Sequence, residues 1–226
     1  MPAQVLNLPT TTAVQGAEDV HVTTLAQTMA DDFVRQGWAM RENFLELARW
    51  QALAAEAERL WEQGAFRKAG VGRVSAQRVD AGIRGDYTLW LDAQLTPAAC
   101  EFVTRELETL RSALNAAAYL GLFEFEGHFA KYPAGARYAR HLDQPGGSEA
   151  RRVSMVLYLN EDWQSGEGGE LCLYPPGPLQ ETAATAVQVL PRGGTLAIFA
   201  SAGTHHEVRV ARRPRLSLSG WLRNRA

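Results

Sequence analysis

The stretch His205-His-Glu-Val-Arg-Val-Ala-Arg-Arg-Pro-Arg-Leu-Ser-Leu-Ser-Gly-Trp-Leu222 decides the fold and the search for a site. In its second half Arg215, Ser217, Ser219 and Trp221 stand at every second position, and leucines fill most positions between them. Side chains of a strand alternate between its two faces. The pattern therefore predicts a strand with one leucine face against helices and one polar face inside a barrel.

Arg215 would then be buried, and a buried guanidinium without an anion is costly. No acidic residue lies in its own strand. The carboxylate of a ligand, held by the planar fork of the arginine, would supply the anion. The alternative is an internal ion pair with an Asp or Glu elsewhere in the chain.

The first half of the stretch predicts another strand, over Glu207–Val210. On such a strand His206 shares a face with Val208 and Val210. His205 shares the other face with charged residues. Because the apolar face should point into the barrel, we predict that His206 is the inward imidazole and that His205 faces solvent.

A second motif, His141-Leu-Asp143, lies upstream. On an extended segment, residues two apart point to the same side, so this imidazole and carboxylate can bind one metal ion. By itself the motif is more typical of a surface hydrogen-bonded pair. With His206 it becomes a set of two histidines and one carboxylate that leaves three coordination positions open. Such a facial triad is typical of non-haem iron(II) oxygenases.

Short apolar segments separated by turn signals fill the second half of the chain and favour a β-sandwich or barrel. The expected strands are Phe123–Tyr132, Val153–Leu159, Leu171–Tyr174, Val187–Leu190, Thr195–Phe199, Glu207–Val210 and Leu216–Leu222.

Amphipathic segments come first and predict three helices, over Leu25–Gln36, Phe44–Glu62 and Thr96–Tyr119. Helices followed by strands predict an α+β fold. We expect a loose arm over residues 1–24 and one domain over 25–226, with helical support over 25–120 and a barrel core over 121–226.

The composition is that of an ordinary globular protein, with 46% hydrophobic and 21% charged residues among 226. The formal charge of -2 argues against a dedicated nucleic-acid binder. We find no apolar run long enough for a membrane span and no secretory signal. Two cysteines, Cys100 and Cys172, form no metal-binding spacing. Reduced thiols and a cytoplasmic location are therefore expected.

A basic segment lies between the second and third expected helices. Residues 67–84 carry five basic side chains, Arg84 among them, and one acidic side chain, Asp80, so their net charge is 5 − 1 = +4. A solvated loop would explain this composition. The functional interpretation is a flexible cationic finger beside a binding cleft, which includes Arg67, Lys68, Arg73 and Arg78.

The run from Phe129 to Trp221 resembles the iron(II)- and 2-oxoglutarate-dependent dioxygenases of the prolyl hydroxylase branch. The matching motifs are Tyr132-Pro133, Gly135, His141-Leu-Asp143, Tyr158-Leu-Asn160, Gly168-Gly-Glu-Leu171, Pro191-Arg-Gly-Gly194, His206-Glu-Val208, Arg215 and Trp221. Ile83-Arg-Gly-Asp86 and Asn160-Glu-Asp-Trp163 are similar to the hypoxia-inducible-factor prolyl hydroxylases and their bacterial relatives.

This resemblance implies a double-stranded β-helix, or jelly-roll, flanked by N-terminal helices. It implies iron(II) on the triad, 2-oxoglutarate and dioxygen as cosubstrates, and ascorbate as a candidate cofactor. Arg215 would bind the distal carboxylate of 2-oxoglutarate with help from Tyr158. The remaining implied roles are a cosubstrate pocket lined by Tyr132, Ser219 and Trp221, and a structural ion pair between Asp86 and Arg152.

The resemblance also implies a substrate, a prolyl residue in a loop of an intracellular protein. Elongation factor Tu is the candidate if the source is bacterial. The alternatives are hydroxylation of a free amino acid or other small molecule, a non-enzymatic metal-binding jelly-roll, and a nucleic-acid demethylase. The last would use the arginines near the C-terminus.

Overall fold

The computed structural model describes residues 6–7, 17–70, 80, 82–91, 96–144, 150–176 and 186–225. Its helical elements are α1 (Ala17–Gln36), α2 (Leu47–Glu62), α3 (Pro97–Phe102), the π-helical turn η2 (Val103–Leu107) and α4 (Glu108–Ala118). Its strands are β1 (Leu6–Asn7), β2 (Trp38–Arg41), β3 (Arg67–Lys68), β4 (Tyr87–Trp90), β5 (Leu122–Tyr132), β6 (Tyr138–His141), β7 (Arg151–Tyr158), β8 (Leu171–Tyr174), β9 (Val187–Val189), β10 (Leu196–Ala200), β11 (His205–Val208) and β12 (Arg215–Asn224).

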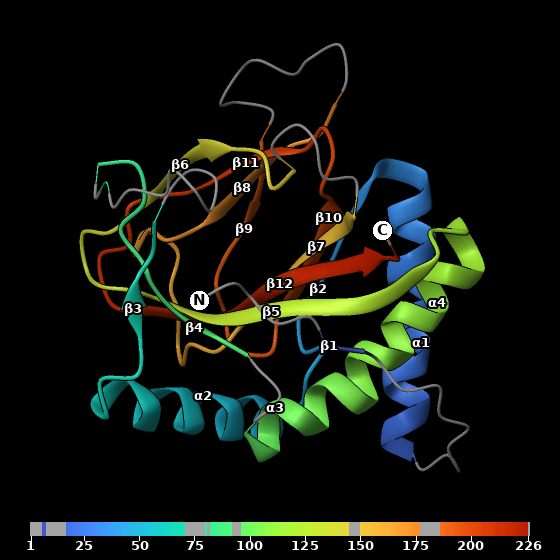
Figure 1. The fold of residues 1–226 in the computed structure, drawn as a ribbon, viewed down its shortest axis with the longest axis horizontal. Coiled ribbons are helices and arrows are strands. Elements are labelled where there is room, and N and C mark those ends of the chain that lie inside the picture. The colour runs from blue at the N-terminus through green and yellow to red at the C-terminus, as the bar shows by residue number, and fades with distance from the viewer. Residues whose placement is uncertain are drawn as a thin grey trace.

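The strands form two antiparallel sheets. The larger has the order β2-β10-β7-β12-β5-β4-β3, with β1 also paired to β5, and the smaller has the order β6-β11-β8-β9. The helices lie on one side of the large sheet and the small sheet lies on the other (Figure 1). This arrangement confirms the predicted α+β class with a jelly-roll core supported by N-terminal helices.

The main hydrophobic core lies between the helices and the large sheet. As predicted, one face of β12 packs into this core, through Leu216, Leu218 and Leu222. The opposite face of β12 carries Arg215 and Ser217, both buried, toward the small sheet. One strand thus separates the structural core from the polar interior of the barrel.

Several element boundaries differ from the prediction. Helix α1 begins at Ala17, eight residues before Leu25, so residues 17–24 belong to a helix and not to a loose arm. Val22 explains this extension, because it packs against the main core one turn ahead of the predicted stripe. The third predicted helix is interrupted by η2, where the wider turn places Glu106 inward against Arg49 of α2 at 2.5 Å.

The strands differ from the prediction in two places. The structure has a strand that was not predicted, β2, which pairs antiparallel with β10 at the edge of the large sheet. The strand predicted over Glu207–Val210 is β11, which ends at Val208, and Val210 is 49% exposed. Within the described residues, no helix is long and apolar enough to cross a membrane.

Candidate functional site

A pocket opens between the two sheets, and the residues predicted to carry chemistry gather around it. His141 comes from β6 and His206 from β11, both in the small sheet, while Arg215 and Trp221 come from β12 in the large sheet. Asp143 follows β6 by two residues and also lines the pocket.

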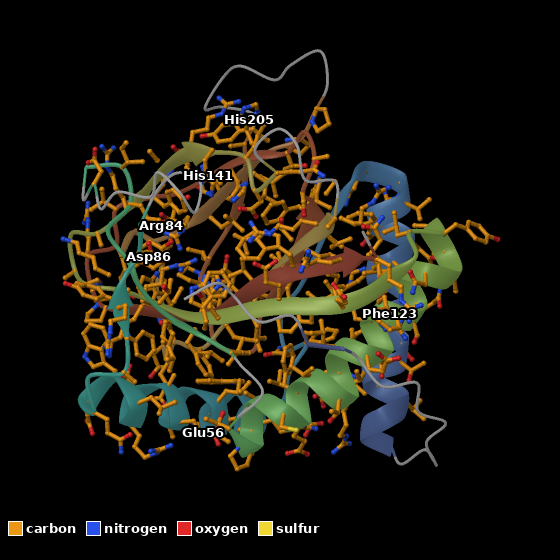
Figure 2. The ribbon with its side chains drawn as sticks, viewed as in Figure 1. Glu56, Arg84, Asp86, Phe123, His141 and His205 are labelled. Carbon is orange, nitrogen blue, oxygen red and sulfur yellow. The ribbon has the colours of Figure 1, made fainter. Side chains whose placement is uncertain are left out.

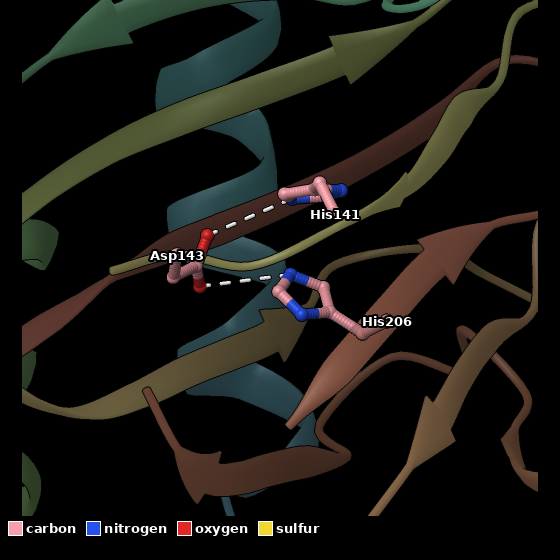
Figure 3. A group of neighbouring side chains, drawn as sticks. All are labelled: His141, Asp143 and His206. Atoms are coloured by element: carbon pink, nitrogen blue, oxygen red, sulfur yellow. Dashed lines mark ion pairs between the residues drawn. The ribbon is translucent and has the colours of Figure 1, made fainter. Parts of the chain in front are cut away.

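The register of the small sheet brings the three triad residues together. His141 and His206 are Cα partners on neighbouring strands. The Nε2 atoms of His141 and His206 each lie 3.6 Å from an oxygen of Asp143 (Figure 3). One ligand atom from each residue lies within 4.8 Å of the others, which is a spacing that fits a single ion. The structure therefore places a two-histidine, one-carboxylate donor set where sequence reasoning expected it.

Backbone carbonyls orient both imidazoles. Nδ1 of His141 lies 2.8 Å from the oxygen of Ala139, and Nδ1 of His206 lies 3.2 Å from the oxygen of Thr204. Because a carbonyl can only accept a hydrogen bond, each Nδ1 carries the hydrogen and leaves the lone pair of Nε2 facing Asp143. This is the tautomer that a metal ligand requires.

Serine hydroxyls hold the carboxylate. Ser154 Oγ donates to Asp143 Oδ2 at 2.7 Å and lies 2.9 Å from Ser201 Oγ. Neither serine was predicted, because no local pattern marks a residue that acts on a ligand from another strand. Such outer contacts orient ligating groups and raise metal affinity.

The electrostatics of the triad favour its metal-binding protonation state. Burial raises the pKa of Asp143, but His206, His141 and the Ser154 hydroxyl outweigh burial and hold that pKa well below its ordinary value. Burial, opposed in part by Asp143, lowers the pKa of His206 to about 4. The site therefore offers a carboxylate and a neutral imidazole at neutral pH, as metal binding requires.

A buried arginine, Arg215, also lines the pocket. Arg215 is 2% exposed, and its guanidinium donates to the Gly169 carbonyl at 3.0 Å and contacts the hydroxyl of Ser217 at 3.4 Å. No carboxylate among the described residues pairs with it. The buried hydroxyl of Tyr158 has no hydrogen-bond partner in the described part of the chain, and its ring centre lies 5.0 Å from the Arg215 guanidinium.

Tyr158 and Tyr132 flank that guanidinium. Tyr132 also lies with its ring centre 5.0 Å from the carbon of the Arg215 guanidinium. Burial, opposed in part by Arg215, raises the pKa of Tyr158 to about 12, so its phenol stays protonated and can donate. A buried cation beside an unpartnered donor is the arrangement that a ligand carboxylate would complete.

The opposite wall of the pocket is aromatic. Ser219 and Trp221 line it as predicted. Trp221 contacts Trp90, with ring centres 6.2 Å apart, and His128, with ring centres 5.7 Å apart. His128 was missed because its inward position in β5 shows only when neighbouring strands are in place.

The predicted ion pair between Asp86 and Arg152 is wrong. Asp86 is fully buried and pairs instead with Arg84, through contacts of 2.7 and 2.9 Å. Arg152 is exposed on β7. Its neighbour Arg151 pairs with Glu126 at 2.6 Å and lies 3.5 Å from the centre of the Trp221 ring. The pairing of β7 with β12 shifts register at this end of the strand, where Arg223 is the partner of Arg151, so simple alternation does not predict which of the two arginines forms the ion pair.

The predicted cationic finger is described only in part. Arg67 and Lys68 are exposed in β3, which pairs with β4. Arg73 and Arg78 lie outside the described residues. His205 is exposed, whereas His206 is buried, as the strand alternation predicted.

Comparison with known proteins agrees with this geometry. The family model of the 2OG-Fe(II) oxygenase superfamily matches residues 127–223. The crystal structure of a Pseudomonas putida prolyl-4-hydroxylase is 37% identical, covers 89% of this chain and 100% of its own, and has a TM-score of 0.78.

The chain belongs to the 2OG-Fe(II) oxygenase superfamily. A prolyl hydroxylase from Trichoplax adhaerens, solved with a hypoxia-inducible-factor peptide, shares the fold of this 2OG-Fe(II) oxygenase, with a TM-score of 0.79, 23% identity and coverage of 93% and 94%. The hypoxia-inducible factor prolyl hydroxylase of Caenorhabditis elegans is 30% identical over 82% of this chain. The chain spans 26% to 55% of the length of the curated relatives it matches.

The donor set fits the cofactors from which the superfamily takes its name. Imidazole and carboxylate suit iron(II), and His141, Asp143 and His206 provide both with three positions left open. Arg215 and the unpartnered hydroxyl of Tyr158 suit the carboxylate of 2-oxoglutarate.

Proposed function

We propose that the protein is an iron(II)- and 2-oxoglutarate-dependent hydroxylase that acts on a prolyl residue of an intracellular protein. The observation that carries the proposal is one pocket lined both by the metal-ligand triad and by the buried Arg215, which forms no ion pair among the described residues. The similarity to the Pseudomonas putida prolyl-4-hydroxylase and to the Caenorhabditis elegans enzyme supports a prolyl substrate.

The chain's own residues would bind, orient and exclude water. His141, Asp143 and His206 would hold the metal on one side and leave the other side to the cosubstrates. Arg215 and Tyr158 would bind the distal carboxylate of 2-oxoglutarate and so direct its keto acid end toward the metal. When bound, iron(II) and 2-oxoglutarate supply the activation of dioxygen, with loss of carbon dioxide and formation of succinate.

The aromatic wall would receive the prolyl ring. Trp221 and His128 line the same pocket as the triad, and Trp90 packs against both rings. Proline has a fixed φ, which lowers the entropy cost of presenting it in a defined position.

The test is incubation of the protein with iron(II), 2-oxoglutarate and a cytosolic extract, with purified elongation factor Tu as one candidate substrate. We expect a tryptic peptide whose proline has gained the mass of one oxygen atom. The reaction should stop when 2-oxoglutarate is omitted and in the His206→Ala variant. Oxidation confined to free proline or another metabolite would contradict a protein substrate, and turnover without 2-oxoglutarate would contradict the reaction.

A further inference from the structure

Two segments that are far apart in sequence join just before the metal ligand His141. Arg84 forms a backbone bridge with Tyr138. The amide of Gly85 donates to the Arg137 carbonyl at 2.9 Å, and the amide of Ala139 donates to the Ile83 carbonyl at 2.8 Å. The bonded backbones therefore fix Tyr138, three residues before His141, against the 83–86 segment.

This close approach depends on a glycine. A Cβ atom at Gly85 would lie 3.0 Å from the Cβ atom of Ala136, which is closer than most real contacts. The 83–86 segment therefore lies directly against the chain that leads into β6. Figure 2 shows Arg84 and Asp86 next to each other, with His141 on the same side of the molecule.

A continuous set of side-chain contacts runs from this junction to His141. The ring of Tyr138 stacks on the imidazole of His141, with centroids 3.6 Å apart and planes 15° apart. The Arg84 guanidinium lies 4.7 Å from the centre of the Tyr138 ring. Asp86 holds that guanidinium through two contacts, of 2.7 and 2.9 Å.

The Arg84–Asp86 pair, which lies at the other end of these contacts from His141, is held firmly by burial. Asp86 is fully buried, and the Arg84 side chain is 17% exposed. Burial lowers the pKa of Arg84, but the bond to Asp86 outweighs burial and keeps that pKa above its ordinary value. The Arg84 guanidinium is therefore charged, and its planar fork has one geometry in which both bonds to Asp86 form.

His141 needs such support. Its Nδ1 donates to the Ala139 carbonyl, and its ring contacts the His206 ring, with centroids 4.1 Å apart; rotation of the ring about the Nδ1 hydrogen bond would break the second contact. A stacked phenol on one face opposes this rotation, which would turn Nε2 away from Asp143.

We propose that Tyr138 is a positioning residue for the metal ligand His141 and that the Arg84–Asp86 ion pair holds Tyr138 in place. The inference rests on the metal site of the proposed function and is independent of the substrate. It assigns the 83–86 segment a role in the geometry of the metal centre.

The test measures cobalt(II) binding to the metal-free protein by calorimetry, together with the visible absorption of the bound cobalt. We expect Tyr138→Leu to weaken cobalt binding by about 10-fold, because loss of an outer contact to a ligating histidine costs 10- to 100-fold in metal affinity. Tyr138→Phe keeps the stacked ring and should bind within about twofold of wild type.

A matched control is Tyr174→Leu. Like Tyr138, Tyr174 lies on a strand of the small sheet and beneath an arginine, since the Arg140 guanidinium carbon is 4.0 Å from the centre of its ring. Its hydroxyl donates to Glu207. Its removal should leave cobalt affinity and absorption unchanged.

The ion pair is tested by the double variant Arg84→Gln/Asp86→Asn. Removing Arg84 alone would leave a buried carboxylate unpaired and risk unfolding the protein, whereas the double variant removes both charges. We expect a folded protein with weaker cobalt binding and an absorption band altered in the same sense as in Tyr138→Leu.

Equal cobalt affinity and absorption in wild type and Tyr138→Leu would overturn the proposal. So would an equal loss in Tyr138→Leu and Tyr174→Leu. A wild-type protein that binds no cobalt would overturn the metal site itself. A protein that binds cobalt as expected but hydroxylates no protein would contradict only the proposed substrate.

Discussion

Adjacent histidines have opposite environments because they sit on opposite faces of β11. His206 is 5% exposed and faces Asp143, whereas His205 faces outward. We predict that His206→Ala weakens cobalt(II) binding by more than about 100-fold, since it removes a ligand and not merely an outer contact. His205→Ala should leave binding unchanged, as measured by calorimetry on the metal-free protein. The reverse result would contradict the assignment of ligands by strand alternation.

Arg215 is the residue whose burial is hardest to explain without a ligand. Truncating one member of a buried charge pair costs about 2–5 kcal/mol, which corresponds to roughly 30- to 4,000-fold in affinity. We predict that Arg215→Ala raises the KM for 2-oxoglutarate by that amount, and that Tyr158→Phe raises it by about 10-fold through loss of one hydrogen bond. Titration of 2-oxoglutarate into the cobalt-loaded protein checks both values, and an unchanged affinity would exclude this anion site.

His128 should make the metal-free protein sensitive to acid. Burial and the nearby Arg84 lower its pKa from 6.5 to about 3, while Asp86 and Asp143 oppose this and Arg151 adds to it. The unfolded chain takes up this proton below pH 6.5, but the folded chain does not until about pH 3. The free energy of unfolding therefore falls as the pH falls across this window.

The expected slope from one such proton is about 1.4 kcal/mol per pH unit. His206, with a pKa of about 4, adds to the loss over a narrower window. We predict that in His128→Gln the free energy of unfolding depends less steeply on pH, with about one proton fewer taken up on unfolding. Urea unfolding between pH 6.5 and 4 measures this slope. If wild type and His128→Gln showed the same slope, His128 would take up its proton as readily in the folded protein as in the unfolded protein.

At the scale of elements, the turn before β8 sets the position of Arg215. Gly169 presents its carbonyl to the Arg215 Nε atom, and Gly168 bridges to Ala211. A Cβ atom at Gly168 would lie 2.0 Å from the Val210 carbonyl oxygen, at a φ of +72°. Only glycine can therefore occupy position 168, where the backbone lies this close to Val210 and has a positive φ.

Gly168→Ala should lower the free energy of unfolding by about 2–5 kcal/mol, since left-handed strain and overpacking add. Gly166→Ala is the matched control: its φ is +92°, but nothing lies within 4 Å of its added Cβ. It should cost about 1–2 kcal/mol from strain alone. Urea unfolding of the metal-free protein measures both, and equal losses would contradict the steric argument.

At the scale of the whole molecule, the structural core and the site occupy opposite faces of the same strands. On β10, Leu196 and Ile198 belong to the core beneath the helices, whereas Ala197 and Phe199 face the barrel interior. Phe199 contacts His206, with ring centres 4.6 Å apart. Stability and metal binding should therefore respond to different substitutions.

Met29 tests this separation. It is fully buried in α1 and belongs to the core beneath the sheet. We predict that Met29→Ala lowers the free energy of unfolding by about 2–5 kcal/mol through a cavity, while the cobalt affinity of the folded protein stays within about twofold of wild type. A parallel loss of metal affinity would show that the helical layer and the metal centre are coupled.

The arginines near the C-terminus do not form one patch. Arg212 and Arg213 precede β12, and Arg225 follows it, so the ten residues of β12 separate them by roughly 30 Å. Arg213 is also paired with Glu167. Among the described residues, these arginines therefore lie near the two ends of β12 and not side by side along it.

The features that depend on local periodicity could be predicted from the sequence. Alternation placed His206 inward, and it placed Arg215 opposite the leucine face of β12, because the side-chain period of a strand is a property of the strand alone. The His-x-Asp spacing placed two donors on one side for the same reason. These patterns, with the family motifs, were enough to predict the α+β jelly-roll, the triad and the anion site.

Contacts between residues of different elements could not be predicted from local patterns in the sequence. Asp86 pairs with Arg84 instead of Arg152, Ser154 binds Asp143, and Tyr138 stacks on His141. Each contact depends on strand order and register, which bring together residues that no local pattern relates. The start of α1 was misplaced because, ahead of Leu25, Val22 packs against the core while Val20 is exposed, so the first turns carry only a weak apolar pattern.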